Sequence, residues 1–85
     1  MTTQKYITAE ELEKVLIEKY GILIGGENLW KVLGFQSAGS FQRAATRKLI
    51  PLKIFPIDNR KGKFALAHDV ANYLVQQREK YNESV

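Results

Sequence analysis

The sequence predicts one domain of the α+β class, mainly helical, with a short antiparallel sheet of two or three strands. Four segments show the apolar spacing of amphipathic helices, and two runs rich in β-branched and aromatic residues flank a turn-forming sequence. A chain of 85 residues is too short for a second core, and 45% hydrophobic residues are typical of a folded protein. We therefore expect residues 1–85 to form a single domain.

A capping box at residues 8–11 opens the first predicted helix. In this motif the Thr8 hydroxyl accepts the Glu11 N–H, and the Glu11 carboxylate accepts the Thr8 N–H. The helix is acidic, lies within residues 1–20 and ends at Gly21. Its predicted apolar stripe is Leu12, Val15, Leu16 and Tyr20. Residues 22–24 follow as a short buried strand.

Residues 26–48 show the pattern of a helix-turn-helix. The first of its helices covers residues 27–33, with Gly34 in the left-handed C-cap position and Phe35 folded back on the last turn. Ser40 is the expected N-cap of the second helix, which runs to Lys48 and ends before Pro51. The inner face of this second helix carries Phe41, Ala44 and Ala45, with Leu49 as a further candidate; its outer face carries Gln42, Arg43, Thr46 and Arg47.

A hairpin is predicted over residues 51–67, the position called a wing when it follows a helix-turn-helix. Its strands are residues 52–57 and 64–67, and the turn between them carries Arg60, Lys61 and Lys63. The last helix covers residues 68–80, with Val70, Tyr73, Leu74 and Gln77 facing inward.

Positive charge is concentrated in the middle of the chain. Residues 31–66 hold eight cations and one anion, whereas residues 1–30 sum to −2 and residues 67–85 sum to −1. Such a basic segment between acidic flanks indicates a face that meets a polyanion.

Five short segments carry a resemblance to a known family. Residues 33–34 end a helix, residues 49–52 lead into the hairpin, a hydrophobic strand reaches Ile57, residues 64–66 return, and residues 69–74 open the last helix. From about Tyr20 to Arg78 the chain resembles the small winged helix-turn-helix proteins of phages and mobile elements. These include phage excisionases and pyocin activator proteins, relatives of the MerR-type DNA-binding domain. The resemblance implies sequence-specific binding of double-stranded DNA, in transcription regulation or recombination.

The candidate site combines the second helix of the helix-turn-helix with the wing. Arg can pair with guanine and Gln with adenine in the major groove, while Lys and Arg on the wing neutralise phosphates or reach the minor groove. The structural alternatives are an ordinary solvated helix face and an ordinary hairpin tip. Lys31, Lys48 and Lys53 are weaker phosphate candidates. The predicted DNA-binding residues are Ser40, Gln42, Arg43, Thr46, Arg47, Lys48, Lys53, Arg60, Lys61 and Lys63.

Other function classes are disfavoured. The single histidine, His68, and the lack of cysteine supply neither a catalytic set nor a metal site, so we expect no enzyme, cofactor or metal. The first residues lack the apolar run of a signal peptide, and no apolar stretch approaches the roughly 20 residues of a membrane span, so we expect a cytoplasmic protein.

The partner expected is double-stranded DNA, bound by a homodimer or by several cooperating copies. An integrase or RNA polymerase is a candidate protein partner. The acidic first helix cannot lie against DNA and either covers the core or meets another subunit. The alternative function is a winged-helix interaction module whose basic face binds an acidic protein.

Overall fold

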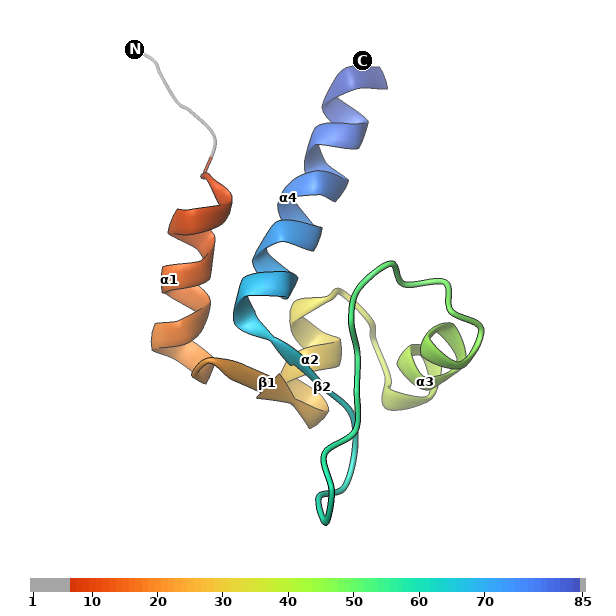
Figure 1. Cartoon of the computed structure of the whole chain (residues 1–85). Helices are drawn as coiled ribbons and strands as arrows, with labels where there is room; N and C mark the ends of the chain where they lie inside the picture. Colours follow the sequence, from red (N-terminus) through yellow and green to blue (C-terminus); the bar gives the residue numbers. More distant parts are fainter. Residues whose placement is uncertain (1–6, 85) are drawn as a thin grey trace.

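The computed structural model describes residues 7–84, which form four helices and a two-stranded antiparallel sheet (Figure 1). The predicted α+β, mainly helical class is confirmed. Residues 1–6 and 85 of the predicted domain lie outside the described residues. The elements in order are α1 (Ala9–Tyr20), β1 (Leu23–Gly25), α2 (Gly26–Val32), α3 (Ala38–Thr46), β2 (Phe64–Leu66) and α4 (Ala67–Ser84).

The start and the end of α1 are as predicted. The Thr8 hydroxyl accepts the Glu11 N–H at 3.1 Å, the Glu11 carboxylate accepts the Thr8 N–H at 2.9 Å, and Gly21 ends the helix with φ 94°. Leu16 is buried, but Val15 is 49% exposed, so its placement on the buried stripe was wrong. Ile17 packs on the core instead, because α1 contacts α4 along one side only (Figure 1).

The sheet joins two parts of the chain that are distant in sequence. Leu23, Ile24 and Gly25 of β1 pair with Leu66, Ala65 and Phe64 of β2. Ile22, predicted to be part of a buried strand, is 67% exposed and lies just outside β1. Helix α4 begins directly after β2, at Ala67, whose N–H donates to the Ile22 carbonyl at 2.7 Å. It runs to Ser84, beyond the predicted end near residue 80.

Helix α2 ends in the predicted left-handed cap. Gly34 has φ 93°, the Phe35 N–H donates to the Trp30 carbonyl at 2.9 Å, and the Gly34 N–H donates to the Lys31 carbonyl at 3.0 Å. These two bonds are the Schellman motif, which reverses the chain toward α3.

The boundaries of α3 differ from the prediction. Its N-cap is Ser37, whose hydroxyl oxygen accepts the Ser40 N–H at 3.1 Å, so Ser40 lies inside the helix and does not cap it. The helix ends at Thr46, two residues before the predicted Lys48, because Lys48 adopts a left-handed conformation with φ 57°. The Leu49 side chain is 65% exposed and does not join the inner face; Ile50 is buried in its place.

The wing is a loop rather than a regular two-stranded hairpin. The predicted strand 52–57 does not form, and Phe55 and Phe64 make a single antiparallel bridge with N–O distances of 2.9 and 2.8 Å. Pro51, just before this stretch, and Pro56, within it, have no N–H to donate, which limits the pairing. The loop projects beyond the sheet (Figure 1).

The buried core is small and draws on every element. Helices α1 and α4 lie side by side and antiparallel, and the sheet and α2 close the core below them (Figure 1). Helix α3 contributes one buried side chain, Phe41. The buried apolar residues are Leu16, Ile24, Leu29, Phe41, Ile50, Ala65, Ala67, Val70 and Ala71.

Candidate nucleic-acid interface

The outer face of α3 presents the four polar side chains that the helical spacing predicted. Gln42, Arg43, Thr46 and Arg47 are all exposed, and together with Gly39 they line a shallow depression of about 340 Å³. The opposite face holds buried Phe41 with half-buried Ala44 and Ala45. The predicted division of this helix into inner and outer residues is therefore confirmed from Phe41 to Arg47.

This depression continues toward the wing. A second hollow, of about 230 Å³, is lined by Gln42, Ala45, Thr46 and Lys63, and so shares Gln42 and Thr46 with the first. A third, of about 430 Å³, shares Ala45 and Lys63 with the second and is otherwise lined by Lys48, Ile50, Pro51, Leu52, Lys53 and Ile54. We call these three connected hollows the α3 groove.

The α3 groove is positive throughout. Five cations line it, and none of the described residues in its walls carries a carboxylate. Because no anion neutralises these cations locally, the groove favours an anionic ligand. The cations are Arg43, Arg47, Lys48, Lys53 and Lys63.

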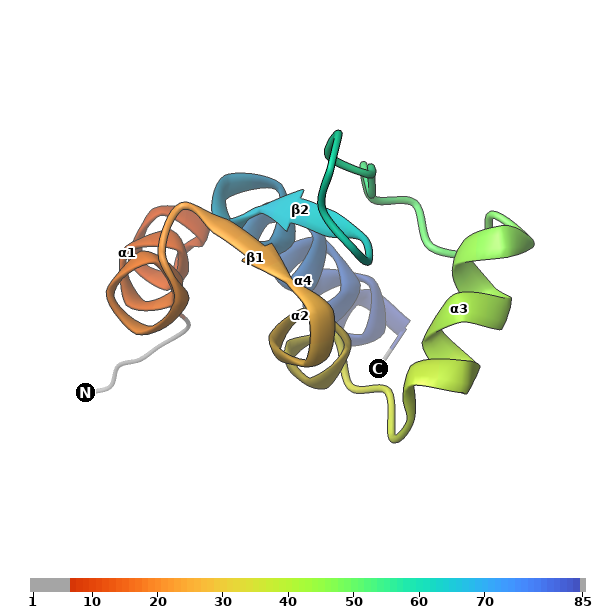
Figure 2. The ribbon, with the colours of Figure 1, turned by 90° about the horizontal axis from the view of Figure 1, so that it is seen from below.

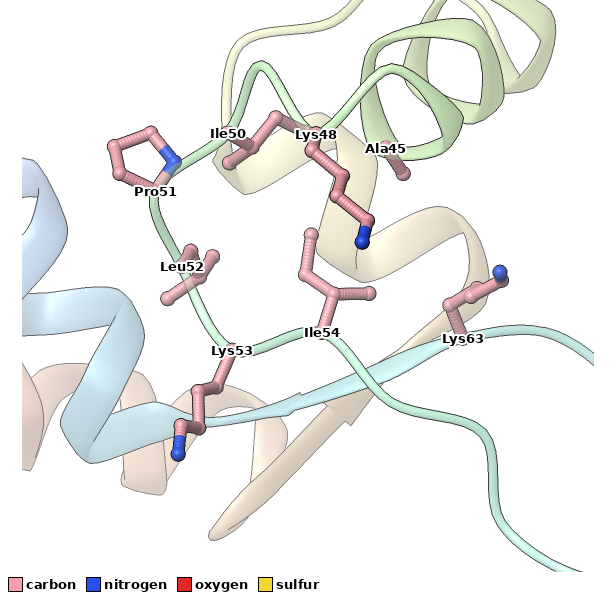
Figure 3. Close-up of a pocket in the computed structure, with 8 residues that line it drawn as sticks. All are labelled: Ala45, Lys48, Ile50, Pro51, Leu52, Lys53, Ile54 and Lys63. Atoms are coloured by element: carbon pink, nitrogen blue, oxygen red, sulfur yellow. The ribbon is translucent and has the colours of Figure 1, made fainter.

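Figure 3 shows how the lysines lie around the third hollow. Lys48 extends from the end of α3 toward Ile54, and Lys63 projects from the chain leading into β2, to one side of Ile54. Lys53 points away from both, and it also lines a separate hollow with Asp69 of α4. Lys48 and Lys63 are therefore the two lysines that flank the Ile54 side of this hollow.

Three of the predicted site residues do not line the groove. Ser40 is half-buried, and its N–H and hydroxyl both contact the Ser37 hydroxyl. Arg60 and Lys61 are exposed at the tip of the wing. Lys31, one of the weaker candidates, pairs with Glu27 at 2.7 Å on α2.

Sequence reasoning missed the apolar floor of the third hollow. Ile50, Leu52 and Ile54 form this floor, where the chain turns at Pro51 and returns past the end of α3. No regular spacing marks these three residues, because the chain turns tightly at Pro51, where the Leu52 N–H donates to the Ile50 carbonyl at 2.7 Å.

The opposite end of the molecule is acidic. Helices α1 and α3 lie at opposite ends, with the sheet and wing between them (Figure 2). Glu10, Glu11 and Glu13 line a hollow on α1. His68 of α4 donates from Nδ1 to the Glu13 carboxylate at 2.9 Å, and this bond and the negative charge of Glu13 raise the pKa of His68, with a smaller contribution from Asp69. His68 thus links α4 to α1.

Two further observations concern the part of the chain that the structure describes. Within residues 7–84, no group of three or more His, Asp or Glu side chains is placed to hold a metal ion. No helix in the same range combines the length and apolar character needed to cross a bilayer.

When compared with protein families, curated proteins and solved structures, the chain matches none. The α3 groove is therefore the feature of the molecule that indicates a function.

Proposed function

We propose that this protein is a winged helix-turn-helix protein that binds double-stranded DNA through the α3 groove, as a non-enzymatic transcription regulator or excisionase-like recombination factor of a phage or mobile element. The observation that carries the proposal is the continuity of the groove. It joins the exposed hydrogen-bonding face of α3 to the lysines beside the wing without an intervening carboxylate.

In this arrangement α3 enters the major groove, which is about 12 Å wide and admits one helix. Arg43 and Arg47 donate to guanine O6 and N7, and the Gln42 amide pairs with adenine. Each such bidentate pair contributes about 1–3 kcal/mol of discrimination. Arg60 and Lys61 at the wing tip reach the neighbouring backbone or the minor groove.

The single small module gains affinity by acting in several copies. One domain of this size buries little DNA surface, so a dimer or cooperating neighbours on adjacent sites supply the rest. The acidic α1 end, which DNA repels, remains available for a second copy or for a protein such as an integrase or RNA polymerase. Such a protein acts in the cytoplasm, where it has access to DNA.

The test compares two double variants with equal loss of charge. Arg43→Ala with Arg47→Ala removes two cations from the α3 groove, and Lys14→Ala with Lys19→Ala removes two from α1. Fluorescence anisotropy with a mixed-sequence duplex of roughly 20 base pairs, two helical turns, measures affinity. We expect the arginine variant to bind at least about tenfold more weakly and the lysine control to bind within about twofold of the original chain.

Equal affinities for the two variants would remove α3 from the recognition role. The alternative function, an interaction module for an acidic protein, predicts a complex that survives nuclease treatment and that duplex DNA does not displace. DNA binding instead predicts that the logarithm of the affinity falls linearly with the logarithm of the salt concentration.

A further inference from the structure

The end of α3 carries an unusual residue for its conformation. Lys48 has φ 57°, in the left-handed region where helix C-caps normally use glycine. Its N–H donates to the Ala45 carbonyl at 3.1 Å, and the next N–H, of Leu49, donates to the Ala44 carbonyl at 2.9 Å. This is the same Schellman motif that ends α2, where the residue at this position is Gly34.

A side chain in this conformation carries a steric cost that glycine avoids. Strained residues of this kind cluster where their side chains have a function. The Lys48 side chain extends over the third hollow of the α3 groove, toward Ile54 and the side from which Lys63 projects (Figure 3). The left-handed cap thus places a cation at the wall of a pocket.

That pocket suits a phosphate with an apolar neighbour. Its volume of about 430 Å³ lies in the range of sites for small organic groups, about 300–1,000 Å³. Its walls carry lysines and no described carboxylate, and Ile50, Leu52 and Ile54 form its floor.

We infer that this pocket seats one phosphate of a nucleic-acid strand together with its deoxyribose. Lys48 and Lys63 contact the phosphate, and the isoleucines and leucine of the floor contact the sugar. The inference rests on the proposed function, because it has the pocket bind the DNA backbone next to the bases that α3 contacts. Lys48 therefore both ends α3 and binds the strand that α3 follows.

The first experiment separates these two roles of Lys48. Lys48→Gly relieves the strained backbone and removes the amine, so we expect Tm to rise by a few degrees while affinity for the mixed-sequence duplex falls. Lys48→Gln and Lys63→Gln remove the charge alone. Each variant should bind about eightfold more weakly at 0.1 M salt, with the slope of log affinity against log salt reduced by about 0.9, the effect of one lost phosphate contact.

Lys19→Gln on α1 is the control that loses one charge outside the groove, and its affinity and salt slope should match those of the original chain. A Lys48→Gly variant with higher Tm and unchanged affinity would show a structural cap only and would overturn the inference. The inference is also overturned if Lys48→Gln and Lys63→Gln leave the salt slope unchanged while Arg43→Ala with Arg47→Ala still abolishes binding. In that case the proposed function would stand.

The second experiment tests the pocket without duplex DNA. Inorganic phosphate is titrated against the isotope-labelled chain at constant ionic strength, with chloride as the comparison. We expect saturable NMR shifts at residues 48, 54 and 63 with phosphate alone, and displacement of the phosphate by duplex. If the chain binds no duplex, the proposed function fails, and saturable shifts would then assign the pocket to a free phosphorylated molecule. Absence of such shifts would overturn the inference.

Discussion

At residue 25 the main chain lies against the ring of Phe64, its partner in the sheet. A Cβ added to Gly25 would lie 2.3 Å from Cδ1 and 2.4 Å from Cε1 of that ring, although φ of −143° suits any residue. Gly25→Ala must therefore displace the ring of Phe64, a residue whose main chain also bridges to Phe55. We expect it to lower the free energy of unfolding by about 1–3 kcal/mol, the usual cost of overpacking, in urea denaturation.

Gly39→Ala is the matched control, because a Cβ there finds Arg43 Nη1 at 3.7 Å, an ordinary contact. Alanine is also more favourable than glycine inside a helix, so Gly39→Ala should raise the free energy of unfolding by up to about 1 kcal/mol. Destabilisation of equal size by both variants would contradict the close contact between Gly25 and Phe64.

At residue 68 a single imidazole links α4 to α1. Since the Glu13 carboxylate raises the pKa of His68 above its ordinary 6.5, the folded state binds the proton more tightly than the unfolded state. The stabilisation from this pair is thus complete below pH 6.5 and is lost as pH rises through the raised pKa. NMR titration of the His68 ring should give a higher pKa in the original chain than in Glu13→Gln. In His68→Gln, the free energy of unfolding should depend less on pH in this range. Identical pKa values in the two chains would contradict the pair.

At the scale of elements, α3 is the helix with the fewest contacts to the rest of the fold, and α2 is the element that it mainly packs against. Phe41 is its one buried side chain, 4% exposed, with its ring edge-on to Phe35 at 5.7 Å between centroids. We expect Phe41→Ala to cost about 3–5 kcal/mol, concentrated in the docking of α3. Hydrogen exchange should show amides 41–46 losing protection while the α1–α4 pair keeps most of its own.

The control is Leu49→Ala, which should change stability by less than about 0.5 kcal/mol because Leu49 is 65% exposed. Uniform loss of protection would show that α3 and the core unfold together.

Structural features that depend on a few neighbouring residues were predicted well from the sequence. The capping box at Thr8, the helix end at Gly21 and the left-handed Gly34 each follow from bonds within one turn. The start of α3 was missed because Ser37 and Ser40 are both good N-caps, and local chemistry does not choose between them. The strand predicted over residues 52–57 does not form, because its apolar residues pack on other elements instead of pairing along a ladder.

The same distinction holds for the candidate site. Helical spacing alone placed Gln42, Arg43, Thr46 and Arg47 on the exposed side of α3. The hollow that Lys48 and Lys63 both line depends on how residues 49–54 fold back past the end of α3, and no periodic pattern encodes that path. The left-handed conformation of Lys48 was equally hidden, since glycine is the usual marker of such a cap.

At the scale of the whole molecule, positive and negative charge lie toward opposite ends of an elongated shape. The chain extends over 49 × 28 × 19 Å, and its radius of gyration of 13.8 Å exceeds the roughly 12 Å expected of a compact domain of this length. Helix α3, which carries the basic groove, lies at one end and the acidic α1 at the other (Figure 2). In the proposed function this polarity orients the molecule, with α3 toward DNA and α1 away from it, and it makes association sensitive to salt.

The most direct measurement is an NMR map of the isotope-labelled chain titrated with a duplex of roughly 20 base pairs. We expect the perturbed amides to lie in α3 and the residues that cap it, 38–48, and near Lys63, while those of α1, residues 9–20, stay unchanged. Perturbation centred on α1, or spread evenly over the molecule, would contradict the assignment of the α3 groove as the DNA-binding surface.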